Sequence, residues 1–170
     1  MKFIIDSNIS FGSESDVADR VKQFIKILEK IEIKPLKKMA YISENKAKIV
    51  LFSEKYNTLD DMMQCVAGVL MQCQNEIKDL NLKINIYNYT NHVLNNVFCE
   101  LVINNSGEII YANRVENNNI TKVKTLLELE MIEEANDLIS FYLESLNFKV
   151  ENLEQLNLLK KRINRFNILL

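Results

Sequence analysis

The sequence predicts an α+β protein: a mixed or antiparallel sheet of about five to six strands, packed by two amphipathic helices and followed by a C-terminal helical pair. Short apolar segments separated by turn residues predict the strands, and longer segments with apolar residues at helical spacing predict the helices. With 170 residues, 48% of them hydrophobic and 26% charged, the composition is that of a globular protein. We expect a single domain over 1–170, with a sheet-containing body (1–116) and a C-terminal helical hairpin (120–170).

The first half of the chain predicts a strand, a helix, two strands and a second helix. The expected ranges are 2–6, 16–32, 38–42, 47–53 and 58–80. Pro35 ends the first helix, because proline disfavours the helical conformation in the residue before it. Thr58 is a candidate N-cap for the second helix, with Asp60 and Asp61 favourably placed in its first turn.

The second half predicts three strands and then two helices. The expected ranges are 83–89, 97–103, 108–115, 120–146 and 152–166. The turn residues 104–107 (Asn-Asn-Ser-Gly) join the last two strands into a hairpin. The one candidate seam is the run Asn117, Asn118 and Asn119, after which the chain is all helix.

From residue 14 to 146 the expected order is helix, two strands, helix, three strands and helix. This order resembles that of roadblock and related profilin-like domains, which serve as dimerising scaffolds for small GTPases and motors. The resemblance lies in element order alone and brings no residue motif with it. It implies a scaffold or adaptor role, and function has to be argued from a site.

Several chemistries lack their residues in this sequence. A nucleophilic triad usually needs a histidine base, and the only histidine is His92, in an Asn-rich loop. Cys65, Cys73 and Cys99 have no CxxC spacing, so we expect free cysteines in the core and no zinc site. The net charge of −2 and the lack of a glycine-rich phosphate loop favour neither nucleic acid nor nucleotide binding. We expect a protein that is not an enzyme and has no cofactor.

One alternative is enzymatic. The opening segment FIID, with Asp6 at the end of a strand and Asn8 nearby, resembles the start of PIN-type nucleases, in which such an aspartate helps to hold Mg²⁺. The resemblance implies a metal-dependent phosphodiesterase or nuclease that uses Asp6 and later carboxylates. The later acids are Glu100, Glu128, Glu133, Glu134 and Asp137.

The favoured hypothesis is a non-enzymatic protein–protein interaction protein: an adaptor, a secretion-type chaperone, an immunity protein or a complex subunit. Its partner would be another protein or a second copy, bound through an apolar helix or sheet face. The candidate surface is the apolar stripe of the last helix, for which core packing is the alternative: Leu156, Leu159, Ile163, Phe166, Leu169 and Leu170. We identify no small-molecule ligand, signal peptide or membrane span, and expect a cytoplasmic location.

Overall fold

The computed structural model describes residues 2–11, 17–31, 37–77, 80–90, 93–104, 106–144 and 150–169. It divides into two compact units, each described by itself below. The sheet unit comprises Met1–Thr90 and Asn95–Val115, and the helical unit comprises Asn91–Leu94 and Glu116–Leu170. The division after Val115 lies next to the Asn117–Asn119 run. No described helix is both long and apolar enough to cross a membrane.

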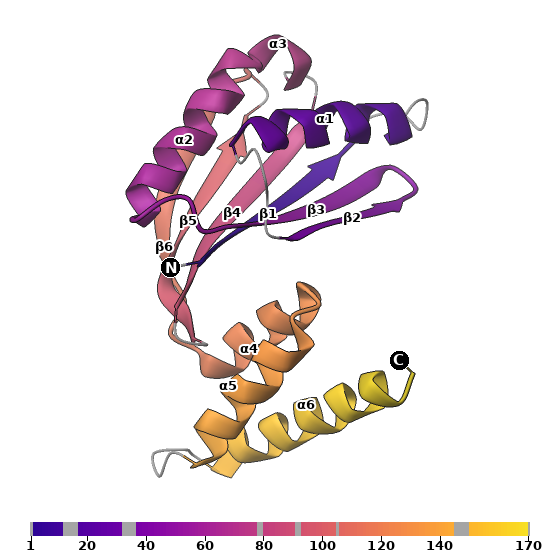
Figure 1. Cartoon of the computed structure of the whole chain (residues 1–170), viewed down its shortest axis with the longest axis vertical. Coiled ribbons are helices and arrows are strands. Elements are labelled where there is room, and N and C mark those ends of the chain that lie inside the picture. Colours follow the sequence, from indigo (N-terminus) through magenta and orange to yellow (C-terminus); the bar gives the residue numbers. More distant parts are fainter. Residues whose placement is uncertain are drawn as a thin grey trace. The chain divides into compact units, whose positions relative to one another are not determined.

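The sheet unit is built on a six-stranded sheet with the strand order β2-β3-β1-β4-β5-β6 (Figure 1). Its elements are β1 (Lys2–Ser10), α1 (Val17–Ile31), β2 (Lys37–Ser43), β3 (Lys46–Ser53), α2 (Leu59–Gln72), α3 (Gln74–Ile77), β4 (Asn81–Thr90), β5 (Val93–Ile103) and β6 (Ile109–Val115). The sheet is antiparallel, so the predicted α+β class is confirmed. Strand β1 lies between β3 and β4, in the middle of the sheet. The roadblock-like element order begins at residue 14 and so does not include this strand.

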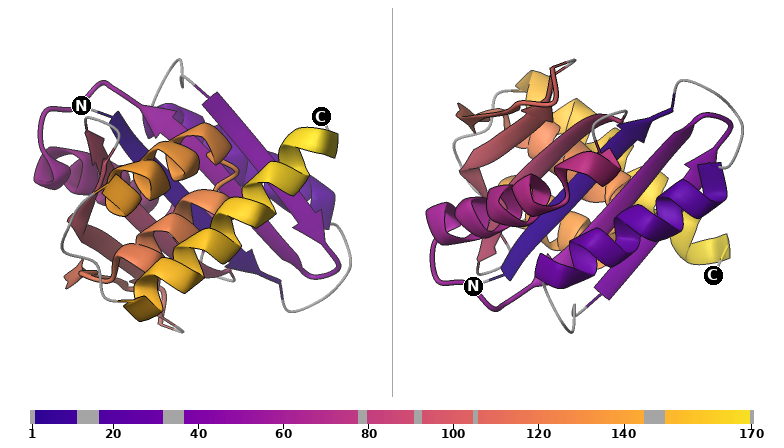
Figure 2. Two further views of the ribbon diagram at one scale, coloured as in Figure 1. Left: turned by 90° about the horizontal axis from the view of Figure 1, so that it is seen from below. Right: turned by 90° about the horizontal axis from the view of Figure 1, so that it is seen from above.

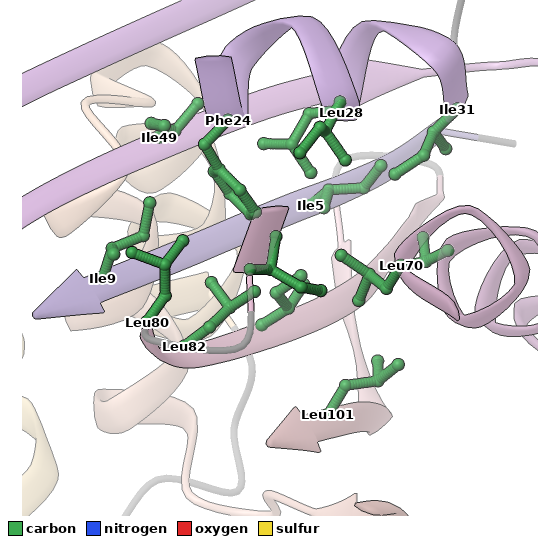
Figure 3. Close-up of a cluster of buried hydrophobic side chains, with 14 of the residues drawn as sticks. Ile5, Ile9, Phe24, Leu28, Ile31, Ile49, Leu70, Leu80, Leu82 and Leu101 are labelled. Atoms are coloured by element: carbon green, nitrogen blue, oxygen red, sulfur yellow. The ribbon is translucent and has the colours of Figure 1, made fainter. Parts of the chain in front are cut away.

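One face of the sheet, here the first face, carries the core of this unit. Helices α1 and α2 lie over this face of the sheet (Figure 2, right). Phe24 and Leu28 of α1 point towards Ile5 of β1 (Figure 3), and all three side chains are buried. Because alternate strand residues share a face, Ile5 and Ile9 pack into this core while their neighbours point to the opposite, second face.

The predicted helix 58–80 starts as expected but is not continuous. The Thr58 hydroxyl accepts a hydrogen bond from the Asp61 N–H at 3.1 Å, which confirms the N-cap. The helix then breaks at Cys73, whose φ of −104° and ψ of 22° lie outside the helical region. The short helix α3 follows the break.

The helical unit contains α4 (Asn119–Glu128), α5 (Ile132–Glu144) and α6 (Val150–Leu169). The predicted single helix 120–146 is therefore wrong, because α4 ends in a Schellman motif. The Met131 N–H bonds to the Leu126 carbonyl at 2.9 Å and the Glu130 N–H to the Leu127 carbonyl at 3.1 Å. Glu130 takes the left-handed conformation with φ of 56°, which a glycine usually fills. Figure 2 (left) shows the three helices from below.

Candidate functional site

The second face of the sheet is organised in rows of directly paired residues across β3, β1 and β4. Strand β1 supplies the middle residue of each row, and the pairing is antiparallel on both of its sides. In order along the strand, the rows are Phe52–Ile4–Tyr87, Val50–Asp6–Asn85, Lys48–Asn8–Lys83 and Lys46–Ser10–Asn81. Along β1 this face thus changes from apolar through acidic to basic and polar.

Asp6 marks the change in chemistry on this face. Its side chain is only 7% exposed, and its Oδ2 lies 3.6 Å from the Lys48 Nζ. A buried carboxylate without a cation is costly, so this ion pair compensates for the burial of Asp6. The pair also ties Asp6 to the basic row beside it.

A second acid, Glu100 of β5, neutralises part of the basic end. Its carboxylate contacts Lys83 Nζ at 2.5 Å and the Arg114 guanidinium at 3.0 Å. The hydrogen bond from Lys83, followed by that from Arg114, lowers the pKa of Glu100 against the opposing effect of burial. Glu100 is therefore ionised at neutral pH and holds Lys83 on the second face.

The basic and polar rows line a groove with a volume of about 610 Å³. Its charged lining residues are Lys46, Lys48 and Lys83, and none of the described lining residues is acidic. Tyr41 of β2 is paired with Lys48 and therefore extends the row Lys48–Asn8–Lys83 on the same face. This combination of cations, amides and hydroxyls is suited to holding an anion.

The structure places the predicted partner-binding residues of α6 in two groups. Leu156, Leu159 and Ile163 are buried, and α6 contacts α4 and α5 within the helical unit. The side chains of Phe166 and Leu169, and the whole of Leu170, lie outside the described residues. The role of this stripe in binding stays a prediction.

The residues proposed for a metal site are not brought together in the part of the chain described here. Asp6 is paired with Lys48, and Glu100 with Lys83 and Arg114. The described residues contain no group of three His, Cys, Asp or Glu side chains that could hold a metal ion. His92 lies outside the described residues.

A scan against protein-family models gives no match to this chain, and a search of curated proteins finds no significant relative. The function must therefore be inferred from the structure of the described residues.

Sequence reasoning missed the groove. Lys46 and Lys48 alternate with apolar residues in KAKIVLF, which signals a strand with one polar face. Asn8 lies between Lys48 and Lys83 because β1 pairs with both β3 and β4. Local sequence patterns do not predict this pairing of distant segments. Without it, these lysines look like separate solvated side chains.

Proposed function

We propose that this chain is a non-enzymatic protein–protein interaction protein that associates with a second copy of itself through the β6 edge of its sheet. The observation that carries the proposal is the exposure of apolar side chains on an edge strand. Ile110 and Tyr111 are each 55% exposed and Val115 is 66% exposed. An exposed apolar edge strand is a template for pairing with another chain.

The two edges of the sheet differ in this respect. The other edge strand, β2, carries Lys38, which is paired with Glu29 of α1, and a lysine on an edge opposes pairing with another chain. β6 contains no lysine, and its one cation, Arg114, is paired with Glu100 inside the sheet. β6 is thus the edge better suited to strand addition.

The turn before β6 indicates which of its backbone groups point outwards. The Asn104 N–H bonds to the Glu108 carbonyl at 3.1 Å, so this pair is hydrogen-bonded across the β5–β6 hairpin. Hydrogen-bonded pairs alternate along an antiparallel ladder. The residues whose backbone groups face away from β5 are therefore Ile109, Tyr111, Asn113 and Val115.

This pattern is compatible with pairing to a copy related by a two-fold axis at Ala112. Tyr111 would then pair with Asn113 of the copy, and Ile109 with Val115 of the copy. The small Ala112 would meet its own copy on the axis, where paired side chains come closest. Arg114 would face Ile110 of the copy, so the arrangement places no like charges opposite each other.

Sedimentation equilibrium over a concentration series tests the proposal with a charge pair at Ile110. Ile110→Lys places a cation opposite Arg114 of the copy and should abolish the dimer, whereas Ile110→Glu places an anion there and should retain it. Ile42→Lys on β2, where Ile42 is 51% exposed, is the matched control and should leave the dimer intact. A wild-type chain that stays monomeric throughout, or equal loss in all three variants, would contradict the proposal.

The sequence-based alternative of a metal-dependent phosphodiesterase gains no support among the described residues, because Asp6 lies beside Lys48 and no described group of three His, Cys, Asp or Glu side chains could hold a metal ion. Titration with Mn²⁺ monitored by calorimetry would revive it if binding were lost in Asp6→Asn.

A further inference from the structure

We propose that the groove on the second face binds a small phosphorylated molecule, with the phosphate held among Lys46, Lys48 and Lys83. This inference goes beyond the proposed self-association and does not depend on it. It rests on the charge, the neutral hydrogen-bond donors and the size of the groove.

The charge of the groove opposes that of the whole chain. The chain has a formal net charge of −2, yet the charged side chains that line the groove are all lysines. Two of them are paired with acids outside the lining, Lys48 with Asp6 and Lys83 with Glu100. Among the described residues, no ion pair is found for Lys46, which pairs directly with Ser10 of β1. At 3.6 Å from Asp6, Lys48 keeps ammonium donors for another acceptor, since lysine has three.

The neutral polar residues of the groove add donors at fixed places. Asn8 is paired directly with Lys48 on one side and with Lys83 on the other, so its amide lies between two cations. Ser10 is similarly placed between Lys46 and Asn81. Amide and hydroxyl groups donate hydrogen bonds to phosphate oxygens, and lysine binds phosphate as a compact point charge. Because a β-strand fixes the backbone of each residue, the donors are held in register.

The size of the groove indicates more than a bare ion. Its volume of about 610 Å³ lies within the range of roughly 300–1,000 Å³ that is usual for sites of small organic ligands. Tyr41 and Val102 also line it, and offer a ring and an aliphatic side chain to the organic part of a ligand. The ligand class is therefore a phosphate ester with a small organic group.

Calorimetric titration of the full chain with inorganic phosphate and with phenyl phosphate, at constant ionic strength, tests the proposal. Wild type should bind both, and phenyl phosphate more tightly because of its ring. Lys46→Gln should weaken both by about ten-fold, since a hydrogen bond to a charged group is worth roughly 1.5 kcal/mol or more. Lys22→Gln on α1, with a side chain 72% exposed and away from the groove, is the matched control and should bind as wild type.

Tyr41→Ala should remove the advantage of phenyl phosphate and leave inorganic phosphate unchanged. Thermal unfolding of each variant verifies that the fold is retained. Equal affinities in wild type and Lys46→Gln, or equal weakening by Lys46→Gln and Lys22→Gln, would overturn the groove as a phosphate site. A Tyr41→Ala chain that still prefers phenyl phosphate would overturn the placement of the organic group.

Discussion

At the groove, the two faces of the sheet carry opposite chemistry on the same strands. Ile49 lies in the first-face core, while its neighbour Lys48 lines the groove on the second face. In β1, Ile5 and Asp6 divide in the same way. Since side chains alternate along a strand, one segment can encode stability on one face and a binding site on the other. Substitutions at odd and even positions should therefore have separable effects.

The largest effect is expected in the first-face core. Phe24→Ala removes a side chain that is 1% exposed, and should lower the free energy of unfolding by about 3–5 kcal/mol through lost burial and the cavity left behind. Tyr41→Ala, on the second face, should change it by no more than about 0.5 kcal/mol. Urea unfolding measures both. Similar losses in the two variants would mean that the faces do not divide stability as described.

Part of the pH dependence of stability at high pH should also come from the first face. Burial, then Asp60 and Glu100, raises the pKa of the Cys99 thiol from 9.0 to about 11. The unfolded chain then loses this proton first, so stability is full below pH 9 and falls as the pH rises towards 11. The loss should be roughly 2–3 kcal/mol.

Chemical unfolding at a series of pH values measures this loss. Cys99→Ala should remove that part of the slope between pH 9 and pH 11, whatever its effect at neutral pH. Cys65→Ala is the control, since Cys65 is only partly buried. Parallel slopes in wild type and Cys99→Ala would exclude the buried thiol as the cause.

On the second face, the ion pairs of Glu100 with Lys83 and Arg114 should make stability depend on pH in the acid range, but to a smaller extent. The pKa of Glu100 is lowered, chiefly by Lys83, so its contribution exists above the ordinary carboxyl pKa and is lost as the pH falls through the folded value. Glu100→Gln should cost about 1 kcal/mol or less at pH 7, because Lys83 and Arg114 are half exposed and screened by solvent. The difference from wild type should shrink as the pH falls below the ordinary carboxyl pKa, and a constant difference would argue against a charge effect.

The smallest effect is expected at a buried polar residue on the first face. Ser7 is fully buried, and its Oγ has no hydrogen-bond partner among the described residues. Ser7→Ala removes an unsatisfied hydroxyl with little change in volume, so it should be neutral or stabilise the fold by up to about 1 kcal/mol. A clear loss of stability on urea unfolding would show that the hydroxyl is used. Thr90→Ala, on the same sheet, removes a hydroxyl that donates to Asn88 and should not stabilise.

Local patterns predicted most elements, and pairing between distant segments accounts for what they missed. The sequence predicts a first strand over 2–6, and the polar residues Asp6, Ser7 and Asn8 give no local signal that it continues. It continues to Ser10, since β3 and β4 supply neighbours on both sides. The sequence does not predict the helix end at Glu130, because the left-handed position holds a glutamate and not the usual glycine.

The central place of β1 has a consequence for the way in which the chain acquires its structure. β1 precedes both of its neighbours in the sequence, and β4 follows only after β3 and α2. The chain segments that separate β1 from β3 and from β4 must therefore close into loops before the middle of the sheet can form. Contacts between such remote segments slow folding. On the ribosome, a nascent chain that ends before Asn81 would expose one side of β1, so the final assembly of the sheet should await the emergence of β4.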